Sequence, residues 1–328
     1  MRVLTWHVHG SYLYYLAQAP HDFYVPVKSG RPEGYGGRAP GFPWPDNLHE
    51  IPADQVAGLP LDCVLFQSRR NYVEDQFEVL SEPQRQLPRL YLEHDPPREH
   101  PTDTRHVVDD PAVLLVHVTS FNDLMWDAGR TPTRVVEHGG IVPDGLRYTG
   151  ELERGLVVVN GLARRGRRLG ADVFERARRE VPLDLVGMLS EELGGLGEVG
   201  HGALPELELR YRFFFNPIRY TSLGLAVCEA MMLGMPVVGL ATTEMPAVVE
   251  NGVSGFVETS TTRLVDRMRE LLADPALAQR LGEGARRAAR ERFDIRRFAN
   301  DWDRVIREAA GRRVSAPIGE PALRGGTA

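Results

Sequence analysis

The stretch that decides the fold runs from residue 213 to residue 256 and reads FFFNPIRYTSLGLAVCEAMMLGMPVVGLATTEMPAVVENGVSGF. It begins with an apolar run that ends at Asn216, and a polar turn follows. The pattern then predicts a helix that Ser222 caps and that ends at Gly234, because serine is a favoured N-cap and glycine often terminates helices. A second apolar run, PVVGL, follows at once. Strand, helix and strand in this order indicate a parallel α/β sheet.

The same alternation of short apolar runs and helical patterns extends over most of the chain. Helical spacing is present at 72–80 and 120–128. The strands that we expect lie at residues 2–8, 62–66, 89–93, 112–118 and 134–138 in the first half, and at 156–160, 183–187, 213–216, 236–240 and 254–258 in the second. Residues 28–52 are rich in glycine and proline, and we expect them to form a long loop. These patterns predict two doubly wound α/β domains.

The domain boundaries follow from where this alternation pauses and restarts. A break near residues 149–154 precedes a new strand-and-helix series, so we place the first domain at 1–150 and the second at 151–296. Residues 297–310 have apolar side chains at helical spacing, which need a partner surface. We expect 311–328 to be a mobile tail, since it has little apolar surface to bury.

Composition excludes several classes of protein. The 328 residues are 42% hydrophobic and 26% charged, which is ordinary for a soluble globular protein. The net charge of −6 argues against a nucleic-acid partner that needs a broad basic face. Cys63 and Cys228 lie in apolar runs and predict a reducing compartment. Without an apparent signal peptide or membrane span, we expect a cytoplasmic protein, either free or peripheral at the inner face of a membrane.

Three weaker patterns are better explained by structure than by function. Glycines at 195, 197 and 200 spell GxGxxG, but they do not directly follow an apolar strand. Asp301 and Asp303 alternate with an apolar residue on the last helix, so a solvated face explains them. His94, Asp95 and His100 are interrupted by prolines and lack a fourth ligand, so we expect no metal site there.

Glu229 is an acid in an otherwise apolar helix, which is costly unless the carboxylate has a partner. One alternative is an arginine partner that holds the fold. The other is a ribose diol that donates two hydrogen bonds to the carboxylate. The second alternative agrees with the position of the helix, since its free N-terminal amides favour phosphate at the carboxyl edge of the sheet.

These residues resemble the donor-binding motif of the retaining glycosyltransferases of family 4, which have the GT-B fold. In that family a Pro-Ser-x-x-Glu-x-Phe-Gly pattern is followed by Glu-Ala-Met, a small residue, Gly-x-Pro-Val-Val. Pro217, Gly224, the segment Glu229-Ala230-Met231, Gly234 and Pro236-Val237-Val238 fall in register, as does VVENGVSGF at 248–256. The resemblance implies two Rossmann-like domains that face a central cleft, and a last helix that crosses back to the first domain.

The family resemblance also implies roles for residues of the second domain. Glu229 would bind the ribose hydroxyls, and Ser222, Leu223, Gly224 and Leu225 would bind the donor at the start of the helix. The family has a first glutamate, which contacts sugar hydroxyls, where this chain has Thr221. Threonine has no charge, so we expect a change in donor orientation or in activity.

The resemblance extends to a basic cluster and to two loops of the first half. In the family a basic pair neutralises the leaving diphosphate, and here the candidates are Arg164, Arg165, Arg167 and Arg168, with a solvated surface as the alternative. His94 ends a strand where relatives place a histidine near the reacting sugar. His9, Gly10 and Ser11 stand where relatives have a loop that faces the donor. Either histidine is otherwise a polar residue at a strand end.

The function that this resemblance implies is transfer of a hexose from a nucleotide diphosphate sugar to an acceptor hydroxyl with retention. The catalytic candidates are His94, Arg165, Arg168 and Thr221, with Arg164 among the donor-binding ones. Neither a metal nor another cofactor is expected, because arginines and helix amides supply the positive charge. The alternatives are a nucleotide-sugar epimerase and a non-catalytic nucleotide-sugar-binding protein. The acceptor (a saccharide, a lipid or a small molecule), the donor and the oligomeric state are not specified by the sequence.

Overall fold

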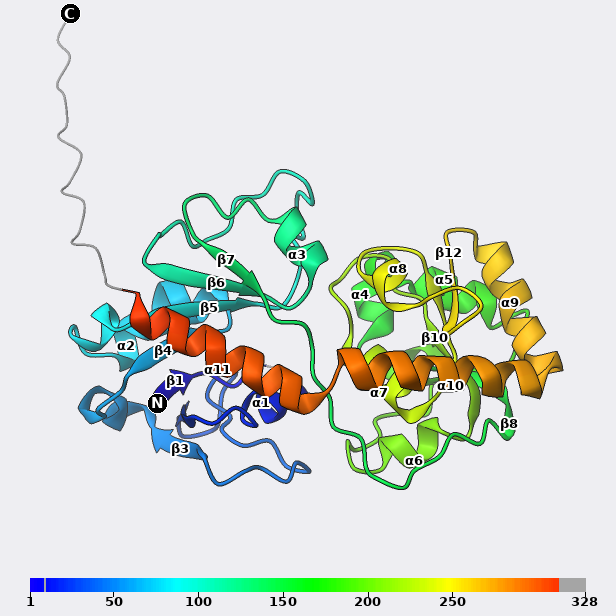
Figure 1. Cartoon of the computed structure of the whole chain (residues 1–328), viewed down its shortest axis with the longest axis horizontal. Helices are drawn as coiled ribbons and strands as arrows, with labels where there is room; N and C mark the ends of the chain where they lie inside the picture. Colours follow the sequence, from blue (N-terminus) through cyan, green and yellow to red (C-terminus); the bar gives the residue numbers. More distant parts are fainter. Residues whose placement is uncertain (9, 313–328) are drawn as a thin grey trace, which may run out of the picture.

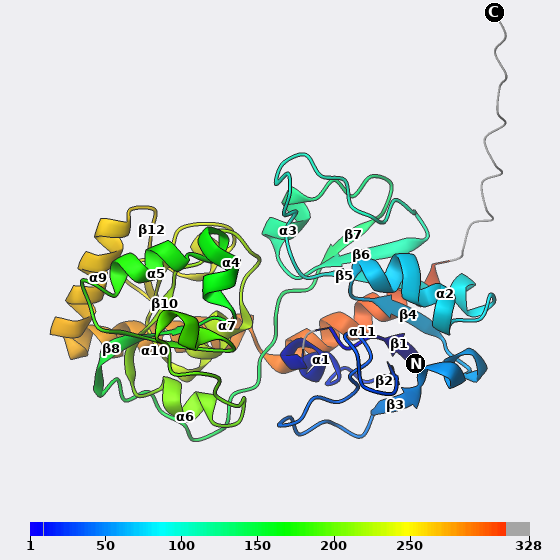
Figure 2. The same cartoon turned by 180° about the vertical axis from the view of Figure 1, so that it is seen from behind.

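Two α/β domains lie side by side in the computed structural model, which describes residues 1–8 and 10–312 (Figure 1). His9, which we expected in a donor-facing loop, and the tail expected at 313–328 lie outside the described residues. The chain passes between the domains twice, once after β7 and once between α10 and α11, as both views show (Figures 1 and 2).

The first domain is built on a parallel sheet. In the described part of the chain this sheet has seven strands in the order β3-β2-β1-β4-β5-β6-β7. The strands are β1 (Arg2–Thr5), β2 (Asp22–Val27), β3 (Leu48–Pro52), β4 (Cys63–Phe66), β5 (Arg89–Glu93), β6 (Val113–His117) and β7 (Thr133–Val135). The long loop expected at 28–52 is shorter than predicted, because its last five residues form β3 and pair with β2. Strand order reverses between β1 and β4, which is the switch point of this sheet.

Helices cover both faces of the first sheet. The helical segments are α1 (Gly10–Leu16), η1 (Ala53–Gly58), η2 (Asn71–Asp75), α2 (Gln76–Val79), η3 (Gln84–Gln86) and α3 (Ser120–Met125). Buried side chains of α1 and α11 form one core with the sheet, and side chains of η1 and α2 form another. The sheet therefore lies between two layers, as expected for a doubly wound domain.

The second domain repeats this plan with a smaller parallel sheet. Its five strands within the described residues have the order β12-β11-β10-β8-β9. They are β8 (Leu152–Val158), β9 (Leu183–Val186), β10 (Tyr211–Asn216), β11 (Val237–Leu240) and β12 (Gly255–Glu258). The helical segments are α4 (Leu162–Leu169), α5 (Ala171–Ala177), η4 (Ser190–Leu193), α6 (Leu204–Glu208), α7 (Leu225–Leu233), α8 (Met245–Val248), α9 (Thr261–Ala273) and α10 (Pro275–Arg292). The switch point lies between β8 and β10.

The last helix, α11 (Ile295–Gly311), returns to the first domain and runs along it (Figures 1 and 2). Asp294 caps α11 through the amide of Arg297, at 2.9 Å. Side chains of α11 belong to the same buried cluster as Tyr12 and the first sheet: Phe298, Trp302, Val305, Ile306 and Ala309. The apolar face predicted from the sequence therefore has its partner, and the predicted crossover helix is confirmed.

Candidate functional site

The loops that follow β8 and β10 meet at the switch point of the second sheet. Gly170 ends α4 with a φ of +83°, and a Cβ there would lie 1.9 Å from the carbonyl oxygen of Pro217. The backbone carbonyl of Arg168 also accepts hydrogen bonds from the amides of Arg219 and Tyr220, both at 3.1 Å. The arginine-rich segment is therefore packed directly against the loop that begins α7.

The start of α7 differs from the sequence prediction. Ser222 does not cap the helix; α7 begins at Leu225, with Gly224 in an extended conformation at the N-cap position and no side-chain cap. The buried His138 explains the difference, because its Nε2 is 2.8 Å from the carbonyl oxygen of Leu223 and holds this loop out of helical geometry. The predicted end of the helix at Gly234 is confirmed, with a φ of +92°.

The four arginines of α4 have different surroundings. Arg164 forms an ion pair with Glu192 at 2.6 Å, and Arg167 forms one with Asp172 at 2.8 Å. Within residues 1–8 and 10–312, no carboxylate lies at ion-pair distance from Arg165 or Arg168. Burial lowers the pKa of Arg168, and Arg98 and Arg165 lower it further. Arg165 and Arg168 are thus the two arginines of α4 without an ion-pair partner among the described residues.

Glu229 faces the first domain. Its carboxylate accepts a hydrogen bond of 2.6 Å from the hydroxyl of Tyr15, which belongs to α1. Burial raises the pKa of Glu229, while the bond from Tyr15 and the nearby His201 lower it. Glu208 lies close behind it, and burial followed by repulsion from Glu229 raises the pKa of Glu208 well above its ordinary value. Within the described residues, the acid that the sequence singled out therefore pairs with the hydroxyl of Tyr15 and not with an arginine.

On the first-domain side, His94 lies at the end of β5. Its Nε2 is 3.1 Å from Oε1 of Gln67, and its ring packs edge-on against Tyr12, with 4.9 Å between the ring centroids. Gln67 follows β4 and donates to Oγ1 of Thr5 and to the carbonyl of Trp6, each at 2.8 Å. Gln67 therefore links His94, after β5, to the end of β1 at the switch point of the first sheet, a role that the sequence did not reveal.

Gly10 and Ser11 form the first turn of α1, on the helix that also carries Tyr15. A Cβ on Gly10 would lie 3.4 Å from Nε2 of His7 and 3.5 Å from the ring of Phe42. Phe42 in turn stacks on His201 of the second domain, with 4.5 Å between the ring centroids. Through Phe42, Gly10 is thus linked to His201, a residue of the second domain that lies near Glu229.

Thr221 contacts the first domain directly. Its hydroxyl donates a hydrogen bond of 3.2 Å to Oδ1 of Asp95, which follows His94. Arg98 pairs with the other oxygen of the same carboxylate. The structure therefore brings Thr221 to Asp95, which follows His94, and Glu229 to Tyr15, on the helix that begins with Gly10 and Ser11. Asp95, Tyr15 and His138 were not predicted to take part, and these contacts between distant residues leave no local sequence signal.

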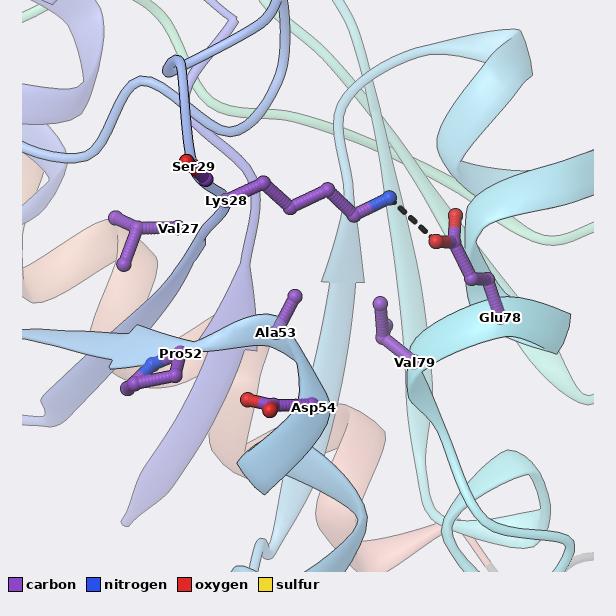
Figure 3. Close-up of a pocket in the computed structure, with 8 residues that line it drawn as sticks. All are labelled: Val27, Lys28, Ser29, Pro52, Ala53, Asp54, Glu78 and Val79. Carbon is purple, nitrogen blue, oxygen red and sulfur yellow. Dashed lines mark hydrogen bonds and ion pairs between the residues drawn. The ribbon is translucent and has the colours of Figure 1, made fainter.

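A separate hollow of 460 Å³ lies at the carboxyl ends of β2 and β3, away from the residues described above (Figure 3). Lys28 reaches across it to Glu78, with 2.6 Å between Nζ and Oε1, and Asp54 lies on the opposite wall. The described residues include no group of three or more His, Cys, Asp or Glu side chains placed to hold a metal ion. Among the helices of that same part, none combines the length and the apolar character needed to cross a bilayer.

Comparison with solved structures identifies the fold as GT-B. Sucrose-phosphate synthase from Thermosynechococcus elongatus is similar with a TM-score of 0.68 and 16% identity, over 94% of this chain and 98% of that one. Anabaena Alr3699/HepE in complex with UDP is similar with a TM-score of 0.62 and 14% identity, over 94% of this chain and 99% of that one. The predicted fold class, two Rossmann-like domains with a crossover helix, is confirmed.

Comparison of sequences finds a family match within the second domain. Residues 188–288 match the model of the family described as glycosyl transferases group 1. A stretch of 86 residues is 30% identical to N-acetyl-alpha-D-glucosaminyl L-malate synthase of Bacillus anthracis, over 26% of this chain and 23% of that protein. Residues 188–288 of this GT-B fold are therefore similar to the glycosyl transferases group 1 family, and the chain matches about a quarter of the length of that curated relative.

Proposed function

We propose that this protein transfers a hexose from a nucleoside diphosphate sugar to an acceptor hydroxyl, with retention at the anomeric carbon and without a metal ion. The observation that carries the proposal is the convergence at the second switch point. There the backbone of Arg168 packs against the loop before α7, the helix that carries Glu229, and Thr221 of that loop contacts Asp95 of the first domain, which follows His94. Ligands of doubly wound sheets bind at such points.

The nucleotide would be held by the second domain. The carboxylate of Glu229 already accepts a hydroxyl hydrogen bond from Tyr15, so ribose hydroxyls would replace a group of the same chemistry. Bonds to a charged acceptor contribute about 1.5–3 kcal/mol each. Among the similar solved structures, Anabaena Alr3699/HepE is described in complex with UDP, which agrees with a nucleoside diphosphate as ligand.

The diphosphate would lie between the amides at the start of α7 and the guanidinium groups of Arg165 and Arg168. Negative charge grows on the diphosphate as it leaves, and donors that already point to that charge lower the barrier most. Retention, by the family resemblance, has the acceptor approach from the side of the leaving group, where a diphosphate oxygen takes its proton. No side-chain base is then required.

A panel of nucleotide sugars tests this function. UDP-glucose, UDP-N-acetylglucosamine, GDP-mannose and dTDP-glucose are each incubated with the protein and with mixed saccharide, polyol and lipid acceptors, and free nucleoside diphosphate is followed. Release that depends on an acceptor supports the transferase. An isomerised donor without acceptor supports an epimerase instead. Absence of both release and nucleotide binding contradicts the proposal.

A nucleotide-sugar-binding protein without transfer activity is the second candidate. Thr221 favours it, because the family that the chain resembles has an acid at this position. The same panel separates the two functions: binding by calorimetry with no release of nucleoside diphosphate would identify the binding protein.

A further inference from the structure

Thr221 is the position at which the chain departs from the family motif, and a carboxylate from the other domain lies against it. The Thr221 hydroxyl donates to Oδ1 of Asp95 at 3.2 Å, although the two residues are 126 positions apart. Thr221 belongs to the loop after β10, and Asp95 follows β5. Position 221 itself has no acid, but the carboxylate of Asp95 from the first domain lies in contact with it.

The backbone of Asp95 is fixed by its own domain. Its amide donates to Oε1 of Glu93 at 2.9 Å, and its carbonyl accepts from Nε1 of Trp126 at 2.8 Å. The next two residues are the buried Pro96 and Pro97, which restrict the chain further. The side chain of Asp95 is 22% exposed, so its position is fixed while the carboxylate stays accessible.

The charges around Asp95 are those of the proposed diphosphate site. Arg98 forms an ion pair with Oδ2 of Asp95. Burial, Arg98 and Arg165 lower the pKa of Arg168, whereas Asp95 raises it. A carboxylate has about four acceptor positions. Within the described residues, the Asp95 carboxylate accepts from Thr221 and Arg98, which leaves room for two hydroxyl donors.

We infer that Asp95 supplies the carboxylate that binds hydroxyls of the donor sugar, in place of the acid that the resembled family carries at position 221. The inference rests on the proposed function. It assigns the donor-sugar contact to the first domain, so the sugar is fully held only when the two domains are closed on each other. A donor that lacks the hydroxyl facing Asp95 should therefore react poorly.

The test compares a donor with its deoxy analogues in the full-length protein. The donor is the nucleotide sugar that the wild type consumes fastest in the panel above, and the analogues lack one sugar hydroxyl each. We expect the wild type to discriminate about ten- to a hundredfold in kcat/KM against at least one analogue. Asp95→Asn keeps an oxygen for Thr221 but removes the charge, and we expect it to lose most of this discrimination while its affinity for UDP or GDP stays within about threefold.

Two further variants separate a sugar contact from a structural latch. Asp103→Asn removes an exposed acid eight residues along the same segment and should behave as the wild type. Asp95→Ala/Thr221→Glu returns a carboxylate from the other domain, and we expect it to recover part of the rate and discrimination that Asp95→Ala loses. Unchanged discrimination in Asp95→Asn would overturn the inference. A loss of nucleotide affinity together with a lower melting temperature in Asp95→Asn would also overturn it. A wild type that consumes no nucleotide sugar overturns the proposed function, and this assignment with it.

Discussion

Trp302 connects the crossover helix to the candidate site and gives the sharpest test of the architecture. Its side chain is fully buried in the core of the first domain, and its Nε1 donates to the hydroxyl of Tyr12 at 3.2 Å. Tyr12 in turn packs edge-on against His94, at 4.9 Å between the ring centroids. A change at Trp302 should therefore affect both the stability of the first domain and the position of His94.

The magnitude follows from what each substitution removes. Trp302→Ala leaves a large cavity and should lower the free energy of unfolding by about 3–5 kcal/mol. Trp302→Phe keeps most of the packing but leaves the buried hydroxyl of Tyr12 without its donor, which should cost about 1–3 kcal/mol. Arg304→Ala is the control on the same helix, because Arg304 is 75% exposed and its pair with Asp301 is at the surface. It should change stability by less than about 1 kcal/mol.

Urea denaturation with hydrogen exchange of first-domain amides measures these effects. We expect the destabilisation to decrease in the order Trp302→Ala, Trp302→Phe, Arg304→Ala. Amides of α1 and β5 should exchange faster in Trp302→Ala than in the wild type. If Trp302→Ala costs no more than Arg304→Ala, the crossover helix does not complete the first domain, and that part of the reasoning is refuted.

Three further predictions concern the site. Arg168→Gln should weaken nucleoside diphosphate binding about tenfold but nucleoside binding little, because in the proposed site the guanidinium would bind the phosphates. Calorimetry with the exposed Arg176→Gln as control checks this, and equal losses for both ligands would contradict it. Burial lowers the pKa of His138 from 6.5 to about 4, so the folded state keeps the ring neutral. The free energy of unfolding should be at its full value above pH 6.5 and fall by about 3 kcal/mol as the pH drops from 6.5 through 4. His138→Gln can still donate to Leu223, and in acid denaturation it should lose measurably less stability than the wild type. EDTA should leave transfer activity intact, and loss of activity that Mg²⁺ or Mn²⁺ restores would contradict the metal-free mechanism.

The central strands and α7 could be predicted because buried elements carry apolar residues in patterns that are visible in the sequence. Strands covered on both faces read as continuous apolar runs, and the range predicted for β5 agrees with the observed Arg89–Glu93. β2 and β3 were missed for identifiable reasons. β2 contains Pro26, which argues against a strand, and β3 (LHEIP) is an edge strand that buries only Leu48 fully. Their pairing with the rest of the sheet, not their own pattern, makes them strands.

The site could be predicted only in part. Parallel strands gather their carboxyl ends at one edge, and the loops after β8 and β10 meet there. The contacts that complete the site join residues far apart in the sequence: Tyr15 and Glu229 are 214 positions apart, and Asp95 and Thr221 are 126 apart. No local pattern encodes such pairs. The predicted Ser222 cap was wrong because His138, from the linker between the domains, holds Leu223 in another geometry.

The most direct test of the central claim is nucleoside diphosphate binding by the wild type and by Glu229→Gln. Glutamine still offers an oxygen to Tyr15, so the fold should be retained while the charge is lost. Calorimetry with UDP, GDP and dTDP should show binding by the wild type, and affinity about ten- to a hundredfold weaker for Glu229→Gln, since a bond to the charged carboxylate contributes about 1.5–3 kcal/mol. Glu206→Gln, an exposed acid on α6, is the control and should bind as the wild type does. Equal affinity in the wild type and Glu229→Gln, or no binding of any nucleoside diphosphate by the wild type, would contradict the account.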